Sequence, residues 1–241
     1  KTGLVCVTNL RDFAKGYYSA AKSGYLPFLA RLPEAESGGP SEGGGGSADG
    51  GQTDGSSSGG SGQSGSGGNA DVFDASKTML FYEGKRAAVL EAAETLAFNL
   101  AETSTDFAFG EVVAEENGEP VTFSLKMKIS QKSRALALEG GVPICSFRIR
   151  ANAQIADADT AAGLDEAAKK TIVPGSVLRA AEREFEEQLT AILKKCADSG
   201  CDLFGLKQAL YRNFPREYDA YEKTLLSSAR AAYDIRFSTL H

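Results

Sequence analysis

Two stretches in which apolar and polar side chains strictly alternate constrain the fold more than any other feature of the sequence. The first spans residues 121–129 and the second spans residues 145–155. The apolar positions are Val121, Phe123, Leu125, Met127 and Ile129 in the first stretch, and Cys145, Phe147, Ile149, Ala151, Ala153 and Ile155 in the second. Because successive side chains of a strand point to opposite faces, the pattern predicts long strands with one buried and one wet face, as in antiparallel sheets. Asn117-Gly118 supplies a two-residue hairpin turn just before the first stretch.

Helices are predicted after these strands. Pro174-Gly175-Ser176 marks the start of a long amphipathic helix, whose apolar stripe comprises Leu178, Ala181, Phe185, Leu189, Ile192 and Cys196. Asp202 is expected to cap a short helix, and Pro215 to open a third one. Residues 231–239 alternate again and predict a strand that returns to the sheet. The fold class is therefore α+β, with an antiparallel-rich sheet packed with helices, a long C-terminal amphipathic helix and a closing strand.

The N-terminal part of the sequence predicts smaller elements of the same kinds. Residues 3–7 are interpreted as a short strand, and Asn9 as the cap of a helix that Gly24 ends. An extended, proline-containing segment follows over residues 25–32. Further along, two short strands surround a Glu83-Gly84 turn, and a short helix comes directly after them.

A segment rich in glycine and serine separates these two regions. Of the 27 glycines, 15 lie between Gly38 and Gly68, and residues 33–70 hold no large apolar side chain. Such a segment buries too little surface to order itself and is typical of a flexible tether. Its irregular composition favours a natural insert over an engineered linker. We therefore expect the end of a preceding domain at 1–32, a flexible tether at 33–70 and a C-terminal α+β domain at 71–241.

Charge and hydropathy exclude several classes of partner. The net charge is −6, and no basic stripe interleaved with aromatic residues is present, so we expect no nucleic-acid partner. No apolar run approaches the roughly 20 residues that span a bilayer. The chain starts at Lys1 without an initiator Met. It is therefore expected to be soluble or to be part of a longer protein, and its strand-like opening favours the second reading.

The cysteines and the histidine indicate no catalytic unit. His241, the single histidine, is the last residue and is a poor candidate for a base. Cys196 and Cys201 flank a short turn, and their spacing leaves three readings open: a local disulfide, which is favoured, two free thiols, or a ligand pair. Cys196 also completes the helix stripe, so it is expected to pack in the core. We expect no catalytic residue, no metal site and no cofactor, and the sequence leaves the residues of any ligand-binding site unknown.

Arg148 and Arg150 point the same way from one predicted strand. They could hold an anion or a partner's carboxylate, although a solvated sheet face is the favoured interpretation.

The order of elements after the tether resembles the C-terminal region of the Ger(x)C family, the lipoprotein C subunits of spore nutrient-germinant receptors. The resemblance rests on the strand pair TMLFYEGKRAAVL, on the acid-threonine step Glu94-Thr95, on the run from Asp202 to Pro215, and on the aromatic helix and closing strand that include Tyr218 and Tyr233. Tryptophans that are usual in the family after this proline are absent here. The family's signal peptide, lipid-accepting cysteine and first domain are also absent, and Cys6 lies within the predicted strand and is not the lipidated residue.

This resemblance implies a non-enzymatic subunit of a germinant receptor complex that takes part in nutrient-triggered spore germination. The intact protein would be held by an N-terminal lipid, absent from this chain, on the outer face of the inner spore membrane. Its partners would be the membrane-embedded A- and B-type subunits.

Two other hypotheses stay open beside the receptor subunit. One is another cell-surface binding or scaffold domain on a flexible tether. The other is a hydrolase or thiol enzyme whose active residues lie upstream of this chain.

Overall fold

The computed structural model describes residues 5–6, 8–31, 73–103, 107–116, 118–159 and 172–239. Residues 1–29 and 74–241 are grouped into one compact unit, and the fold described below is that unit. The predicted tether at 33–70 lies outside the described residues, as does His241.

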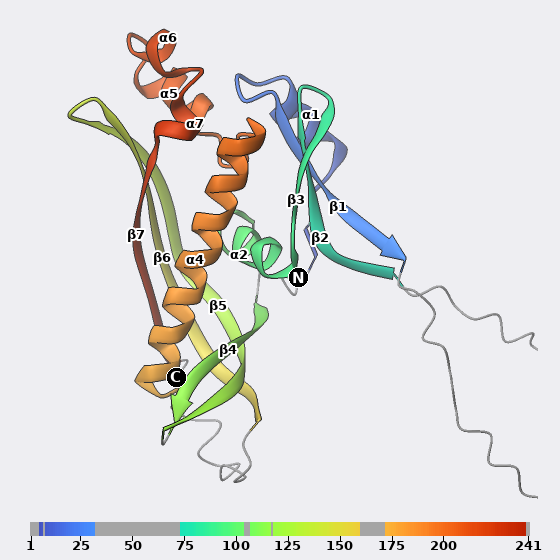
Figure 1. Ribbon diagram of the computed structural model, residues 1–241, viewed down its shortest axis with the longest axis vertical. Coiled ribbons are helices and arrows are strands. Elements are labelled where there is room, and N and C mark those ends of the chain that lie inside the picture. The colour runs from blue at the N-terminus through green and yellow to red at the C-terminus, as the bar shows by residue number, and fades with distance from the viewer. Residues whose placement is uncertain are drawn as a thin grey trace, which may run out of the picture. The chain divides into compact units, whose positions relative to one another are not determined.

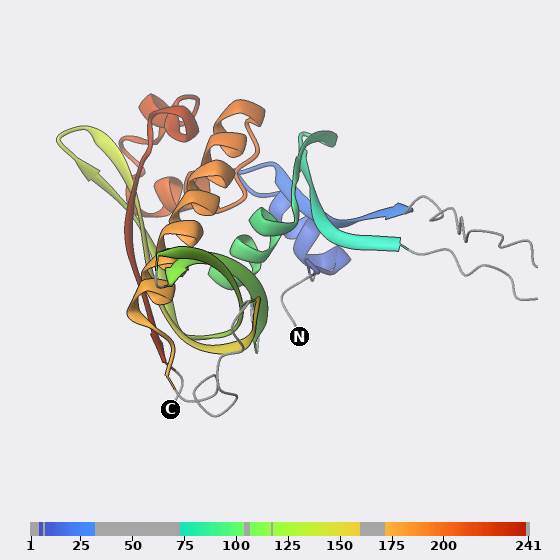
Figure 2. The ribbon, with the colours of Figure 1, turned by 60° about the horizontal axis from the view of Figure 1, so that its bottom comes forward.

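The main sheet has the strand order β4-β5-β6-β7 (Figure 1). Its strands are β4 Ala108–Glu116, β5 Glu119–Glu139, β6 Val142–Asp159 and β7 Arg230–Thr239. Both alternating stretches lie in these strands, and the side chains of Phe123, Leu125 and Phe147 are among those buried as predicted. Gly118 has a φ of +85°, in the left-handed region that a tight hairpin needs. The strands bend strongly near β4 (Figure 2).

The closing strand pairs in parallel with β6, whereas β4, β5 and β6 form an antiparallel meander. Such a parallel pair needs a long crossover, which α4 Gly175–Ser199 and the helices after it supply. The sheet is thus mixed, and the predicted α+β fold with helices and a closing strand is confirmed.

Helix α4 covers one face of the main sheet (Figure 1). Its buried stripe comprises Val177, Ala180, Ala181, Phe185, Leu189, Ile192 and Cys196, close to the prediction. Three short helices follow: α5 Leu206–Asn213, α6 Tyr218–Tyr221 and α7 Leu225–Ser228. The prediction of a single helix after Pro215 is therefore wrong, because the chain forms two separate short helices there, α6 and α7.

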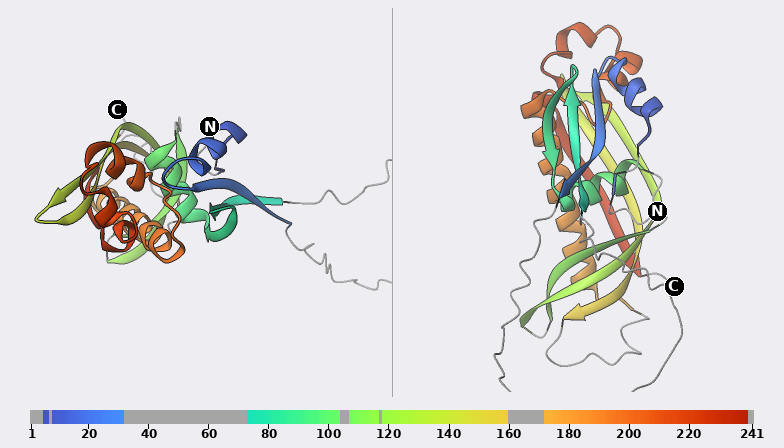
Figure 3. Two further views of the ribbon diagram at one scale, coloured as in Figure 1. Left: turned by 90° about the horizontal axis from the view of Figure 1, so that it is seen from above. Right: turned by 90° about the vertical axis from the view of Figure 1, so that its right-hand side faces the viewer.

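The smaller sheet has the order β1-β2-β3, and its strands lie side by side in Figure 3. They are β1 Ser23–Arg31, β2 Phe73–Tyr82 and β3 Lys85–Leu90, preceded by α1 Leu10–Tyr17 and followed by α2 Ala92–Glu102. Asn9 caps α1 as predicted, because its side chain accepts from the Asp12 amide at 2.9 Å.

Two predictions in this region are wrong. Gly24 lies inside β1 and does not end α1, which stops at Tyr17. A Cβ on Gly24 would lie 2.7 Å from the Phe13 ring, so the glycine allows the strand to approach the helix closely. The strand predicted at 3–7 is not formed at Val5 and Cys6, and its other residues lie outside the described ones.

A chain of aromatic rings joins the two sheets within this unit. Tyr25 of β1 packs edge-on against Phe98 of α2 with ring centroids 4.9 Å apart. Phe98 contacts Phe204 at 6.2 Å, and Phe204 contacts Phe147 of β6 at 5.1 Å. The N-terminal strand therefore shares a core with the main sheet, and edge-to-face pairs of this kind add stability beyond their buried area.

Candidate functional site

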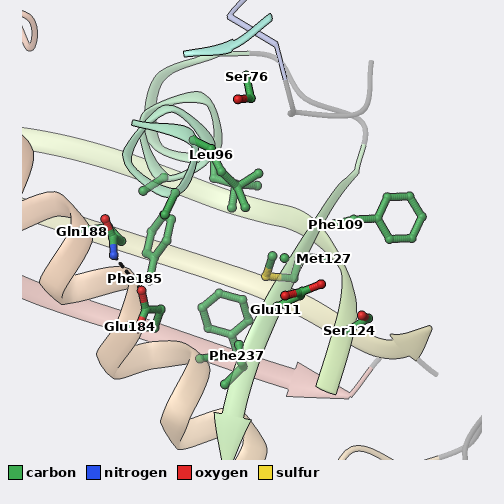
Figure 4. Close-up of a pocket in the computed structure, with 17 residues that line it drawn as sticks. Ser76, Leu96, Phe109, Glu111, Ser124, Met127, Glu184, Phe185, Gln188 and Phe237 are labelled. Carbon is green, nitrogen blue, oxygen red and sulfur yellow. Dashed lines mark hydrogen bonds between the residues drawn. The ribbon is translucent and has the colours of Figure 1, made fainter. Parts of the chain in front are cut away.

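An apolar pocket with a cavity volume of about 520 Å³ lies between α2, α4 and the main sheet (Figure 4). Its wall is formed mainly by apolar side chains, including Leu96, Leu100, Met127, Phe185 and Phe237. In Figure 4, Leu96, Phe185, Phe237 and Met127 surround one common space, while Phe109 points away from it. Its volume falls within the range of small-molecule sites, which are concave and mostly apolar.

The position of α2 fixes one side of the pocket. Glu91 and Glu94 form a capping box at its N-terminus, and the Glu94 carboxylate also accepts from Lys195 of α4 at 2.5 Å. Lys195 donates in addition to the Val89 carbonyl at 2.9 Å. At the next residue, the buried hydroxyls of Thr95 and Thr78 are hydrogen-bonded at 3.1 Å. Glu94 therefore holds α2 against α4, and Thr95 holds it against β2. These contacts keep the pocket walls in place.

A glycine on β4 provides room in the pocket wall. A Cβ on Gly110 would lie 2.8 Å from Met127 Cε and 3.2 Å from Leu96 Cδ2. A larger residue would push one of these two side chains from its place. The small side chains of Ala92 and Ala93 on α2 similarly leave the pocket open on the helix side.

The charged residues of the described lining are Glu111 of β4 and Glu184 of α4, and alternation places the Glu111 side chain on the exposed face of β4 with Phe109. Glu184 accepts a hydrogen bond from Gln188 Nε2 at 2.6 Å (dashed in Figure 4). Among the described residues, the lining includes no Lys or Arg. The pocket can therefore hold an apolar group, with the Glu184 carboxylate near it.

The four cysteines are buried free thiols in the structure. Burial raises the pKa of Cys6 and Cys201 to about 11 and that of Cys145 to about 12, and it also raises the pKa of Cys196. Cys201 Sγ donates to the Phe81 carbonyl at 3.4 Å. A thiol is nucleophilic only as its thiolate, so these environments do not favour thiol chemistry. The predicted Cys196–Cys201 disulfide stays a prediction.

Arg148 and Arg150 both form ion pairs with Asp234 of the same chain. The parallel register places Asp234 of β7 opposite Arg148. Asp234 Oδ2 lies 2.8 Å from Arg150 Nη2 and 3.2 Å from Arg148 Nε. Hydrogen bonds from Arg150 first, and then the charges of both arginines, hold the pKa of Asp234 below its usual value. The two arginines therefore join β6 to β7 on the solvated face.

Two further features concern the part of the chain that the structure describes. Within it, no group of three or more His, Cys, Asp or Glu side chains could hold a metal ion. None of its helices is both long enough and apolar enough to cross a bilayer.

Sequence reasoning missed the pocket. Its lining comes from β2, α2, β4, β5, α4 and β7, so residues far apart in the sequence meet only in the fold. The available signals were weak: a glycine within the strand pattern at Gly110, and adjacent alanines at the start of α2.

Comparisons with known proteins agree on one family. The family model described as "Spore germination B3/ GerAC like, C-terminal" matches residues 76–237. A solved structure described as "Crystal Structure of the GerBC protein" is similar, with a TM-score of 0.53 and 16% sequence identity. That similarity covers 71% of this chain and 53% of the other, so the chain spans about half the length of that protein. At this identity the likeness concerns the fold. A search of curated proteins found no match.

Proposed function

The chain belongs to the spore germination B3/GerAC-like, C-terminal family, and on this premise we propose that it is part of a subunit of a spore germinant receptor. Its role would be in nutrient-triggered spore germination. The single observation that carries this proposal is the family match over residues 76–237, which runs from β2 into β7. The likeness of the fold to the GerBC structure supports it.

We propose that the subunit is not an enzyme. The cysteines support this view, because each of the four is buried and has a raised pKa. The buried carboxylate of Asp202 also has a structural role, since it accepts from the amides of Leu206 and Lys207. A role in binding and assembly fits these environments better than catalysis does.

We propose further that the intact protein is attached by an N-terminal lipid to the outer face of the inner spore membrane. In that position it would contact membrane-embedded A- and B-type receptor subunits. A lipid chain provides the membrane affinity by itself, so the protein surface does not have to bind the membrane. This location and these partners are carried over from the Ger(x)C resemblance.

The test uses the full-length protein in its source organism. Deleting the gene should abolish or strongly slow germination in response to at least one nutrient, and restoring the gene should restore the response. A tagged copy should co-isolate with multi-span membrane proteins from spore membranes. Spores that lack the protein but germinate normally with every nutrient tried would contradict the proposal.

A further inference from the structure

We propose that the pocket between α2, α4 and the main sheet binds a small, uncharged molecule that carries one apolar ring. This inference goes beyond the receptor role and does not depend on it, so its failure would leave that role untouched. The cavity volume of about 520 Å³ falls in the usual range of small-ligand pockets.

Small residues keep the space open on three sides. Ala93 and Ala97 line it from α2, and Ala181 lines it from α4. Gly110 lines it from β4, where a Cβ would lie 2.8 Å from Met127 Cε. Larger side chains at these positions would fill the space from within. Because the walls are apolar, an apolar molecule that covers them removes their surface from water and gains free energy.

The larger side chains around the space suit a ring. Leu96 of α2, Met127 of β5, Phe185 of α4 and Phe237 of β7 surround it (Figure 4). Phe185 and Phe237 already pack edge-to-face, with ring centroids 6.2 Å apart. A ligand ring can extend this aromatic arrangement, and the flexible, polarisable Met127 thioether can adjust to its shape.

The charged residues of the described lining offer little to an ion of either sign. Alternation turns Glu111 away from the space, to the exposed face of β4. Glu184 is exposed on α4 and already accepts from Gln188 Nε2 at 2.6 Å, and water screens its attraction for a ligand amine. Among the described residues, no Lys or Arg lines the pocket to pair with a carboxylate. An ion that enters therefore loses hydration without gaining a partner, which favours an uncharged ligand.

The first experiment compares three probes that share one ring and differ in charge: 4-methylbenzyl alcohol, 4-methylbenzylamine and 4-methylbenzoate. Binding to the chain is measured by titration calorimetry at pH 7, where the amine and the carboxylate are ionised. The alcohol should bind roughly tenfold or more tightly than either ion. An ion that binds as tightly as the alcohol overturns the proposal, and so does the absence of alcohol binding at about 5 mM probe.

The two methionines of the chain locate the binding site. Met127 lines the pocket, whereas Met79 of β2 is outside its described lining. In a protein labelled with ¹³C-methyl methionine, the alcohol should shift the Met127 signal in a saturable way and leave the Met79 signal in place, because a ligand ring shifts the methyl groups that it contacts. Met79→Leu assigns the two signals. A Met127 signal that stays in place while the alcohol binds overturns the proposal.

Filling the pocket should weaken binding. Ala93→Leu enlarges a side chain that is exposed on α2 and lines the pocket, so the variant should fold normally and bind the alcohol roughly tenfold more weakly. Ala220→Leu, on an exposed position of α6, is the control and should leave binding unchanged. Unfolding temperatures of both variants verify the fold. Undiminished binding by a folded Ala93→Leu variant overturns the proposal.

Discussion

Asp202 contributes to stability by capping the first turn of α5 from three residues before Gly205, which is the N-cap residue of that helix. Its side chain accepts from the amides of Leu206 and Lys207, at 2.7 Å each, and only 4% of the residue is exposed. Asp202→Ala should lower the free energy of unfolding by about 2–4 kcal/mol, because it leaves two donors without their partner. Guanidinium unfolding measures the change.

The conservative variant separates capping from charge. Burial raises the pKa of Asp202, so the neutral Asp202→Asn, which keeps one acceptor, should cost less than Asp202→Ala. Asp198→Ala, an exposed position one turn earlier, is the control and should stay within about 0.5 kcal/mol of the parent. An Asp202→Ala variant as stable as its parent would show that the cap is dispensable.

Asp234 makes stability depend on pH in the acid range. Its pKa is lowered by Arg150 and Arg148, so its stabilising effect is present above the unfolded-state pKa of about 4 and is lost as the pH falls through the folded-state pKa. Asp234→Asn should therefore lower the melting temperature at pH 7, and the difference from the parent should shrink below about pH 4. A difference that is constant from pH 7 to pH 2 would contradict this assignment.

The thiols should react slowly in the folded protein, because burial raises the pKa of Cys6, Cys145, Cys196 and Cys201. With a thiol reagent at pH 8, labelling should be slow until guanidinium unfolds the chain. The count after unfolding then tests the proposed bridge, since a Cys196–Cys201 disulfide leaves two reactive thiols and its absence leaves all four. The proposed bridge closes only a short loop, so its loss should cost about 1–2 kcal/mol.

At the scale of the elements, α4 is the main support of the large sheet. Leu189 lies at the centre of its buried stripe and is fully buried. Leu189→Ala should destabilise the protein by about 2–5 kcal/mol, because the cavity it leaves can close only partly. Glu187→Ala, exposed on the same helix, should change stability by less than about 0.5 kcal/mol. Guanidinium unfolding of both variants checks this contrast, and equal losses would contradict it.

How far the sequence predicts an element depends on how local its signal is. Alternation of apolar and polar residues predicted the buried faces of β5 and β6, and apolar residues every three to four positions predicted α4. Each of these patterns arises within a single element that packs one face against the core. The parallel pairing of β7 with β6 could not be predicted in this way. Alternation reports which face is buried and says nothing of strand direction.

The pocket illustrates the same limit at the level of a site. Leu96, Met127, Phe185 and Phe237 are each predictable as core residues, and three of them are in fact buried. The space between them arises from how α2 and α4 pack on the sheet, which depends on contacts such as Glu94 with Lys195 across 101 positions of sequence. Local patterns do not encode such a contact.

At the scale of the whole molecule, the N-terminal segment belongs to the same compact unit as the C-terminal residues. The amide of Asp202 donates to Ser23 Oγ at 2.8 Å, and Tyr25 packs on Phe98. If residues 33–70 are a flexible tether, as we propose, a Glu-specific protease should cut first within it, at Glu34, Glu36 or Glu42.

The two fragments should then stay together in gel filtration and separate only under denaturing conditions, because contacts such as Ser23 with Asp202 and Tyr25 with Phe98 join them. First cuts elsewhere would contradict the proposed tether. Loss of the N-terminal fragment under native conditions would contradict its place in the compact unit.

We propose that the intact protein is a lipid-anchored subunit of a spore germinant receptor. The most direct test is the mass of the N-terminal peptide of the native, full-length protein, isolated from membrane fractions of spores. We predict a diacylglyceryl-modified cysteine upstream of Lys1, in the inner spore membrane fraction. An unmodified N-terminus on a protein found only in the soluble fraction would contradict the claim, and would leave another binding or scaffold role for the same fold.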